Sequence, residues 1–113
     1  MATIVVGVDR AGDLDTLARV GTALADGTRR RILVRLLDGP AYPAELADLV
    51  GTGRANMSNH LACLRGCGLV IAEREGRFVR YQLAHPDLAE ALRLLAGVPL
   101  ATEPGHADFD GRR

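Results

Sequence analysis

The chain has 113 residues with 14 basic and 14 acidic side chains, so its formal net charge is zero. A hydrophobic content of 48% excludes a wholly disordered chain. No apolar run of about 18 residues could span a membrane, and the opening residues lack the basic segment of a secretory signal. We therefore expect a single cytoplasmic domain with no membrane partner. All basic residues are arginine, and residues 29–80 hold nine of them against five acids. That excess fits either a phosphate-facing segment or an ordinary mixed surface.

Two helices are predicted in the first third of the chain. Residues 1–12 are expected to form a flexible arm, and from Asp13 apolar residues recur at helical spacing until Asp26-Gly27. Thr28 can cap the second helix, which Gly39-Pro40 ends. The positions expected on the apolar faces are Leu14, Leu17, Ala18, Gly21 and Leu24 in the first helix, and Ile32, Leu33, Leu36 and Leu37 in the second.

A short helix, a tight turn and a longer helix follow. Pro43 suits the first turn of a helix over residues 43–50, with Leu46, Leu49 and Val50 facing inward. The turn Gly51-Thr52-Gly53 leads into a helix over residues 54–67, which Gly68 ends as a left-handed cap.

The remaining elements are a hairpin and one more helix. Strands are predicted over residues 69–74 and 78–83, joined at Glu75-Gly76-Arg77, and a helix over residues 86–96. Residues 98–113 contain Pro and Gly and are expected to form a flexible tail. The order predicts a mainly α protein with a β-hairpin wing. This is a single winged helix-turn-helix domain over residues 13–97.

The helix over residues 54–67 is the predicted DNA-recognition helix. A helix advances about 100° per residue, so Met57, Leu61 and Leu64 share the buried face while the polar residues lie on another flank. Asn side chains can pair with adenine, and Arg with guanine or phosphate. Arginines at the hairpin tip are placed to reach the DNA backbone or minor groove. The candidate DNA contacts are Arg54, Asn56, Ser58, Asn59 and His60 in the helix, and Arg74 and Arg77 in the wing. His60 has two other interpretations, a core contact or an approach to Cys63.

The rear half of the same flank carries two cysteines, Cys63 and Cys67, one helical turn apart. Two thiolates at this spacing can chelate one soft metal ion but cannot complete its coordination shell. A structural zinc site is disfavoured because no second cysteine pair exists. The spacing leaves two other interpretations open. The cysteines could be two small half-buried packing residues, or they could form a reversible disulfide, which requires distortion of the helix.

Three segments carry a family resemblance. Residues 23–33 (ALADGTRRRIL), 58–70 (SNHLACLRGCGLV) and 75–83 (EGRFVRYQL) resemble the ArsR/SmtB family of metal-sensing repressors, over about residues 14–100. Within that family, the run Cys-Leu-Arg-Gly-Cys-Gly is most similar to the cadmium- and lead-sensing members. The resemblance implies a homodimer built on the first and last helices. It also implies that the metal-free form binds operator DNA and that metal binding releases it.

The resemblance further implies that Cys63 and Cys67 are two of three thiolate ligands. In the cadmium- and lead-sensing members the third cysteine comes from the C-terminal tail, whereas here no cysteine exists outside the pair. Among the tail donors Glu103, His106, Asp108 and Asp110, the first choice as replacement is His106. A harder third ligand lowers the preference for Cd(II) or Pb(II) relative to Zn(II).

The function predicted from these features is a dimeric repressor that a soft metal ion, Cd(II), Pb(II) or Zn(II), releases from double-stranded operator DNA. One alternative is a repressor controlled by thiol oxidation, and another is a winged-helix DNA-binding protein without metal sensing. An enzyme is not expected, because no nucleophile–base constellation or phosphate-cradling glycine loop is present.

Overall fold

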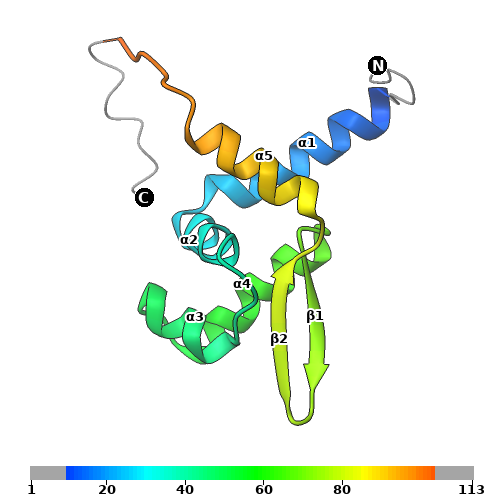
Figure 1. Cartoon of the computed structure of the whole chain (residues 1–113), viewed down its shortest axis with the longest axis vertical. Coiled ribbons are helices and arrows are strands. Elements are labelled where there is room, and N and C mark those ends of the chain that lie inside the picture. Colours follow the sequence, from blue (N-terminus) through cyan, green and yellow to red (C-terminus); the bar gives the residue numbers. More distant parts are fainter. Residues whose placement is uncertain (1–9, 104–113) are drawn as a thin grey trace.

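A computed structural model describes residues 10–103 as five helices and one hairpin (Figure 1). The elements in chain order are α1 (Arg10–Ala25), α2 (Gly27–Leu36), α3 (Pro43–Val50), α4 (Arg54–Gly66), β1 (Val70–Glu75), β2 (Phe78–Leu83) and α5 (Pro86–Ala96). The predicted winged helix-turn-helix is confirmed, with α3 and α4 as the helix-turn-helix and the hairpin as the wing. None of the helices in the described residues is long and apolar enough to cross a membrane.

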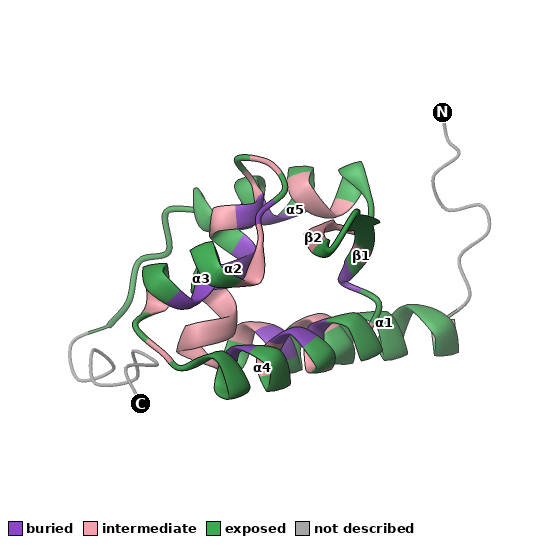
Figure 2. Cartoon of the chain, turned by 90° about the horizontal axis from the view of Figure 1, so that it is seen from below, coloured by how far each residue is buried: buried purple, intermediate pink, exposed green. Residues whose placement is uncertain are grey.

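The core lies where α2, α3 and α4 meet the base of the hairpin. Ile32, Leu46 and Leu64 are fully buried there. Leu92 of α5 and Ala23 of α1 add to the same core, so both outer helices are anchored to it. Helix α4 thus packs into the core through one face, as the helical spacing of its aliphatic residues requires. In Figure 2 most of α1 is exposed, whereas α4 carries a buried stripe.

The hairpin pairs Val70 with Leu83 at its base and Glu75 with Phe78 at its tip. A turn of two residues, Gly76-Arg77, joins the strands, and Gly76 has φ 63°, which glycine adopts without a steric cost. At its middle the wing is attached to the body of the domain, because Ala41 and Tyr81 exchange two backbone hydrogen bonds of 2.9 and 2.8 Å. The wing is therefore oriented by the residues that precede α3.

The helix boundaries differ from the predictions in two places at the start of the chain. Helix α1 begins at Arg10, so residues 10–12 belong to the helix, and the rest of the predicted arm, residues 1–9, lies outside the described residues. The cap of α2 is Asp26 rather than Thr28. Asp26 has an extended backbone, and its carboxylate accepts a 2.9 Å hydrogen bond from the backbone N–H of Arg29, at the third helical position.

Smaller differences concern α4, β1 and α3. Helix α4 ends at Gly66, one residue early, and the left-handed Gly68 (φ 83°) follows. Strand β1 begins at Val70 rather than Leu69. The prediction that Leu49 faces inward is wrong: α3 is only two turns long, Leu46 and Ala47 take its buried face, and Leu49 stays 52% exposed.

Candidate nucleic-acid interface and thiol pair

Helix α4 presents a polar flank to solvent because its large apolar residues are on the opposite face. Met57, Leu61 and Leu64 are buried. Arg54, Asn56, Ser58 and Asn59 are all exposed. One of these residues also has a local role: the Asn56 amide donates a 2.7 Å hydrogen bond to the hydroxyl of Thr52 in the preceding turn. The N-terminal half of α4 can therefore meet a ligand without any rearrangement of the core.

His60 does not lie with these exposed residues. Its side chain is only 16% exposed, and its Nδ1 lies 3.9 Å from Oδ2 of Asp26, the cap of α2. The interpretation of His60 as a DNA contact is therefore not supported, because the imidazole faces α2 across the domain. The carboxylate it meets is held in its charged form: the hydrogen bond from the Arg29 N–H, followed by the charges of Arg29 and His60, lowers the pKa of Asp26 despite partial burial.

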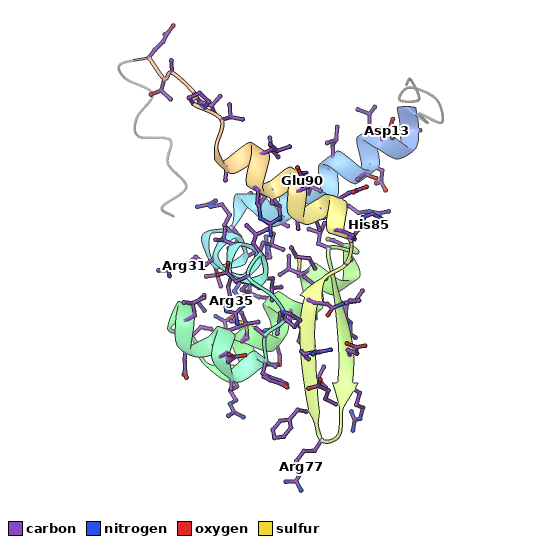
Figure 3. The ribbon with its side chains drawn as sticks, viewed as in Figure 1. Asp13, Arg31, Arg35, Arg77, His85 and Glu90 are labelled. Carbon is purple, nitrogen blue, oxygen red and sulfur yellow. The ribbon has the colours of Figure 1, made fainter. Side chains whose placement is uncertain are left out.

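The wing carries the other two predicted contacts, Arg74 and Arg77, both exposed. Figure 3 shows Arg77 at the tip of the hairpin, pointing away from the domain. Arg80, on the same hairpin, has a different role: it binds Glu73 at 2.7 Å and Glu75 at 3.2 Å. These carboxylates raise the pKa of Arg80, with the Glu73 hydrogen bond as the largest cause. Arg74 and Arg77 are thus the wing arginines available to an external anion.

A polar and aromatic cluster, which the sequence analysis missed, joins the wing to α3. The Tyr42 hydroxyl donates a 2.5 Å hydrogen bond to Glu75, and this bond raises the pKa of Tyr42. The Tyr42 ring also meets Phe78 edge to face, with centroids 6.0 Å apart. Glu45 accepts a 2.8 Å hydrogen bond from the Tyr42 backbone N–H. The spacing of Glu45 three residues after Tyr42 is the one sequence signal that indicates part of this arrangement.

Cys63 and Cys67 are free thiols, and both are half-buried at the end of α4. The backbone N–H of Cys67 donates a 3.0 Å hydrogen bond to the carbonyl of Cys63, so the helical geometry that separates the two residues by one turn extends to Cys67. Cys67 also packs against the core. Within residues 10–103 no group of three His, Cys, Asp or Glu side chains is arranged to hold a metal. A metal on this pair needs a further donor, and the predicted one, His106, lies outside the described residues.

A separate apolar surface covers α1 and α5. Leu14 and Leu17 of α1 are 66% and 64% exposed, although they continue the stripe that brings Leu24 to the core. On α5, Leu94 and Leu95 are exposed while Leu92 is buried, and exposed Val98 and Leu100 follow. Such a concentration of exposed leucine is typical of a surface that another protein covers.

Comparison with known proteins decides the family. The sequence profile described as "Bacterial regulatory protein, arsR family" matches residues 26–72, from the α2 cap into β1. The chain is also 62% identical over 87 residues to the HTH-type transcriptional regulator CmtR of Mycobacterium tuberculosis, covering 77% of this chain and 74% of that one. The chain belongs to the arsR family. Its α3–α4 unit and hairpin are thus the winged helix-turn-helix of an arsR-family transcriptional regulator.

Solved structures agree with the arsR-family fold. The NMR structure of the cadmium metal sensor CmtR from M. tuberculosis has a TM-score of 0.62 at 60% identity, over 78% of this chain and 92% of that one. The homodimeric winged helix-turn-helix DNA-binding domain Mb0332 of Mycobacterium bovis, a possible ArsR-family regulator, has a TM-score of 0.72 at 36% identity. That match covers 80% of this chain and 86% of the other.

Proposed function

We propose that this arsR-family regulator is a dimeric repressor that binds double-stranded operator DNA through α4 and the wing and is released by a soft metal ion held at Cys63 and Cys67. The observation that carries the proposal is that one helix bears both sets of candidate residues. Its exposed front half offers Arg54, Asn56 and Asn59, and its rear end holds two free thiols one turn apart. A change in the position of that helix therefore acts on the DNA contacts directly.

The DNA contacts divide into two classes. Asn56, Ser58 and Asn59 on α4 are placed to read base edges, and Arg54 to bind guanine or phosphate. Arg74 and Arg77 of the wing are placed to bind the backbone, which positions the domain on the duplex. The cluster of Tyr42, Glu75 and Arg80 fixes the angle between wing and helix-turn-helix. The base-reading residues of α4 and the backbone-binding arginines of the wing are thereby held in a fixed relative position.

A dimer is supported by the exposed apolar surface of α1 and α5 and by the homodimeric state of Mb0332. Two copies present two recognition helices to two half-sites, so a small rotation within each subunit changes the fit to both. The protein acts where the operator DNA lies, in the bacterial cytoplasm.

The metal is assigned as Cd(II), with Pb(II) and Zn(II) as further candidates. CmtR is a cadmium metal sensor, and soft thiolate donors favour such ions. Cys63 and Cys67 supply two donors, and His106 is proposed as a third. Bound metal supplies a rigid link between the end of α4 and the residue that completes the shell. Coupling of 1.4 kcal/mol already changes operator affinity about tenfold.

The test combines a metal titration with DNA binding. Reduced protein is titrated with CdCl2 while the thiolate-to-metal absorption in the ultraviolet is recorded. In parallel, release is measured from a fluorescent duplex that the protein itself selected from a random library. We expect Cys63→Ser and Cys67→Ser to bind the duplex as the wild type does, and to lose both the absorption and the release. His106→Ala should weaken the Cd(II) response, while the matched control His85→Asn should leave it unchanged.

Three results would contradict parts of the proposal. Serine variants that still release DNA at the wild-type Cd(II) concentration would place the sensing site elsewhere. Release accompanied by a mass loss of two hydrogens per chain, without added metal, would show a thiol-oxidation switch instead. Equal affinity for selected and random duplexes would indicate a DNA-binding protein without an operator.

A further inference from the structure

A groove of about 510 Å³ lies between α2 and α3, on residues that the proposed function does not use. It is lined by Gly27, Arg30, Arg31, Val34, Arg35, Asp38 and Leu49. Arg31 and Arg35 point from α2 to this side of the domain in Figure 3. Three arginines against one carboxylate give the lining an excess of positive charge, which favours a negatively charged ligand.

The arginines of the groove are positioned differently. Two are held by backbone carbonyls: Arg30 donates to Leu24 at 2.7 Å, and Arg35 donates to Gly39 at 3.0 Å. Arg35 also lies 3.8 Å from Glu45. Arg31 is exposed and makes no hydrogen bond or ion pair within residues 10–103. Its guanidinium can therefore bind a carboxylate with two parallel hydrogen bonds without first breaking another pair.

The groove is also apolar. Val34 of α2 and Leu49 of α3 are 58% and 52% exposed, and both line it. A free inorganic anion or a DNA phosphate gains nothing from these two side chains. An apolar group that carries carboxylates on either side gains both the arginine contacts and the burial of surface. The ligand that fits is therefore an aromatic or aliphatic residue flanked by acids.

We infer that the groove is the docking site for the segment Asp108-Phe109-Asp110 of the same chain. These residues lie outside the described part of the chain. Their sequence is an aromatic residue flanked by two acids, which is the kind of ligand that fits the groove. The Phe109 ring would cover Val34 and Leu49, and the flanking carboxylates would bind the arginines. Phe109 is one of only two phenylalanines in the chain, and the other, Phe78, packs against Tyr42 in the wing.

The tail leaves the domain close to this groove. Leu95 and Ala96, at the end of α5, line a smaller cavity of about 250 Å³ together with Arg30 and Val34, which also line the groove. Arg93 donates a 3.1 Å hydrogen bond to the carbonyl of Leu37, which fixes the end of α5 over the end of α2. Asp108 comes eleven residues after Gly97, and at roughly 3.3–3.6 Å per residue this stretch can extend over roughly 36–40 Å, ample for a return to the groove.

The direction of the docked segment follows from the charges. Arg31 lies within α2, whereas Asp38 lies in the turn after α2 ends at Leu36. The carboxylates of the segment are therefore expected at the Arg31 end. Arg112 and Arg113, which follow the acidic residues, are then placed toward Asp38.

A single-tryptophan variant tests the inference in the full chain. The protein has no Trp, so Phe109→Trp reports on this position alone. In metal-free, reduced protein without DNA, we expect a blue-shifted emission and protection from acrylamide quenching. Both should be lost on adding Arg31→Glu, and also at about 1 M salt, where the Debye length is about 3 Å. The matched control Arg77→Glu makes the same charge change at the wing tip and should leave the emission unchanged.

Two further measurements complete the test. The charge swap Arg31→Glu with Asp108→Arg, which leaves Asp110 facing the remaining arginines, should restore part of the protected emission. Removing residues 104–113 from the wild type should speed amide exchange in α2. Emission typical of solvated Trp in the parent variant, together with α2 exchange unaffected by the truncation, would overturn the inference. The inference would also be overturned if Arg31→Glu weakened DNA binding but left the Trp emission unchanged. In that case the groove would be a contact for DNA phosphate. These experiments use metal-free protein without DNA. A negative result would therefore reject the docking of the tail but would not affect the proposed metal-responsive repressor.

Discussion

Two surfaces of this molecule are exposed for different reasons. The apolar surface, formed by Leu14 and Leu17 of α1 and by Leu94 and Leu95 of α5, is at one end (Figure 1). The polar surface, formed by the exposed flank of α4 and the wing arginines, is at the other. Both belong to helices or strands whose opposite faces are anchored in one core. The difference is one of solvation: leucines gain by removal from water, whereas asparagines and arginines need a partner that replaces water.

The difference between the apolar and the polar surface explains why one small domain carries both surfaces. A core of this size leaves α1 with only Val20, Ala23 and Leu24 packed against it, so most of the helix can contribute only by packing against another protein. The polar surface can stay exposed in the free protein without cost. We therefore expect the apolar surface to determine stability and assembly, and the polar surface to determine DNA recognition.

The largest effect is expected from a charge placed in the apolar surface. Leu17→Glu should convert the dimer to monomers, because burying an unpaired carboxylate costs roughly 3–5 kcal/mol. Operator affinity should fall by roughly a hundredfold or more, since each 1.4 kcal/mol is tenfold. Sedimentation equilibrium measures the first effect and fluorescence anisotropy the second.

Leu49→Glu is the matched control for this prediction. Leu49 is about as exposed as Leu17 but lies on α3. It should leave the dimer intact. If both variants dissociate, or neither does, the apolar surface of α1 and α5 is not the interface.

The sequence predicted the elements well because each has a strong local signal. Pro43 and Pro86 begin helices at the predicted residues, and Gly76 forms the predicted turn. The cap of α2 was missed because Asp26 and Thr28 are both good capping residues, and only the backbone conformation decides between them. Leu49 was expected to face inward, and the stripe of Leu14 and Leu17 was found without its partner, because periodicity identifies an apolar face but not what covers it.

The second effect concerns the α4 part of the polar surface. Asn59→Ala should reduce the preference for the selected duplex over random DNA by about 1–3 kcal/mol, because alanine cannot form the bidentate hydrogen bonds to a base edge. Affinity for random DNA should change little. Competition binding with the two duplexes measures the difference. A variant whose affinity falls equally for both would make Asn59 a backbone-binding residue.

The third effect lies between the two surfaces, at Asp26. Asp26→Ala should lower the free energy of unfolding by about 1 kcal/mol at neutral pH, through loss of the α2 cap. Because the pKa of Asp26 is lowered in the folded state from 3.8, its charge stabilises the fold above the unfolded value. That contribution is lost as the pH falls through the lower folded value. Urea unfolding at several pH values tests this.

The control is Asp26→Asn, which keeps a capping oxygen but does not ionise. It should remain close to the wild type at neutral pH and lose the acid-dependent part of the stability difference. An alanine variant as stable as the wild type would mean that the hydrogen bond to the Arg29 N–H contributes nothing net.

The candidate site was less predictable than the fold, for physical reasons. Asn56, Ser58 and Asn59 could be placed because helical angle alone sets their flank. His60 could not, since its position depends on Asp26, which is distant in sequence. Arg80 differs, because the carboxylates that neutralise it, Glu73 and Glu75, lie on the neighbouring strand of the same hairpin. A third metal ligand cannot be located by periodicity, because the candidate donors beyond α5 follow no helical pattern.

The smallest effect is expected in the wing. Removing one arginine from the polar surface is compared with removing one arginine from α1. Arg77→Ala should weaken binding to selected and random duplexes equally, because binding to a phosphate carries no base information. The slope of log affinity against log salt should become shallower by about one, the change expected when one fewer phosphate is neutralised. Arg19→Ala removes the same charge from α1, where Arg19 pairs with Asp15 at 2.5 Å. It should leave the slope unchanged. Equal slopes for the two variants would mean that net charge, rather than the position of the wing, governs DNA binding.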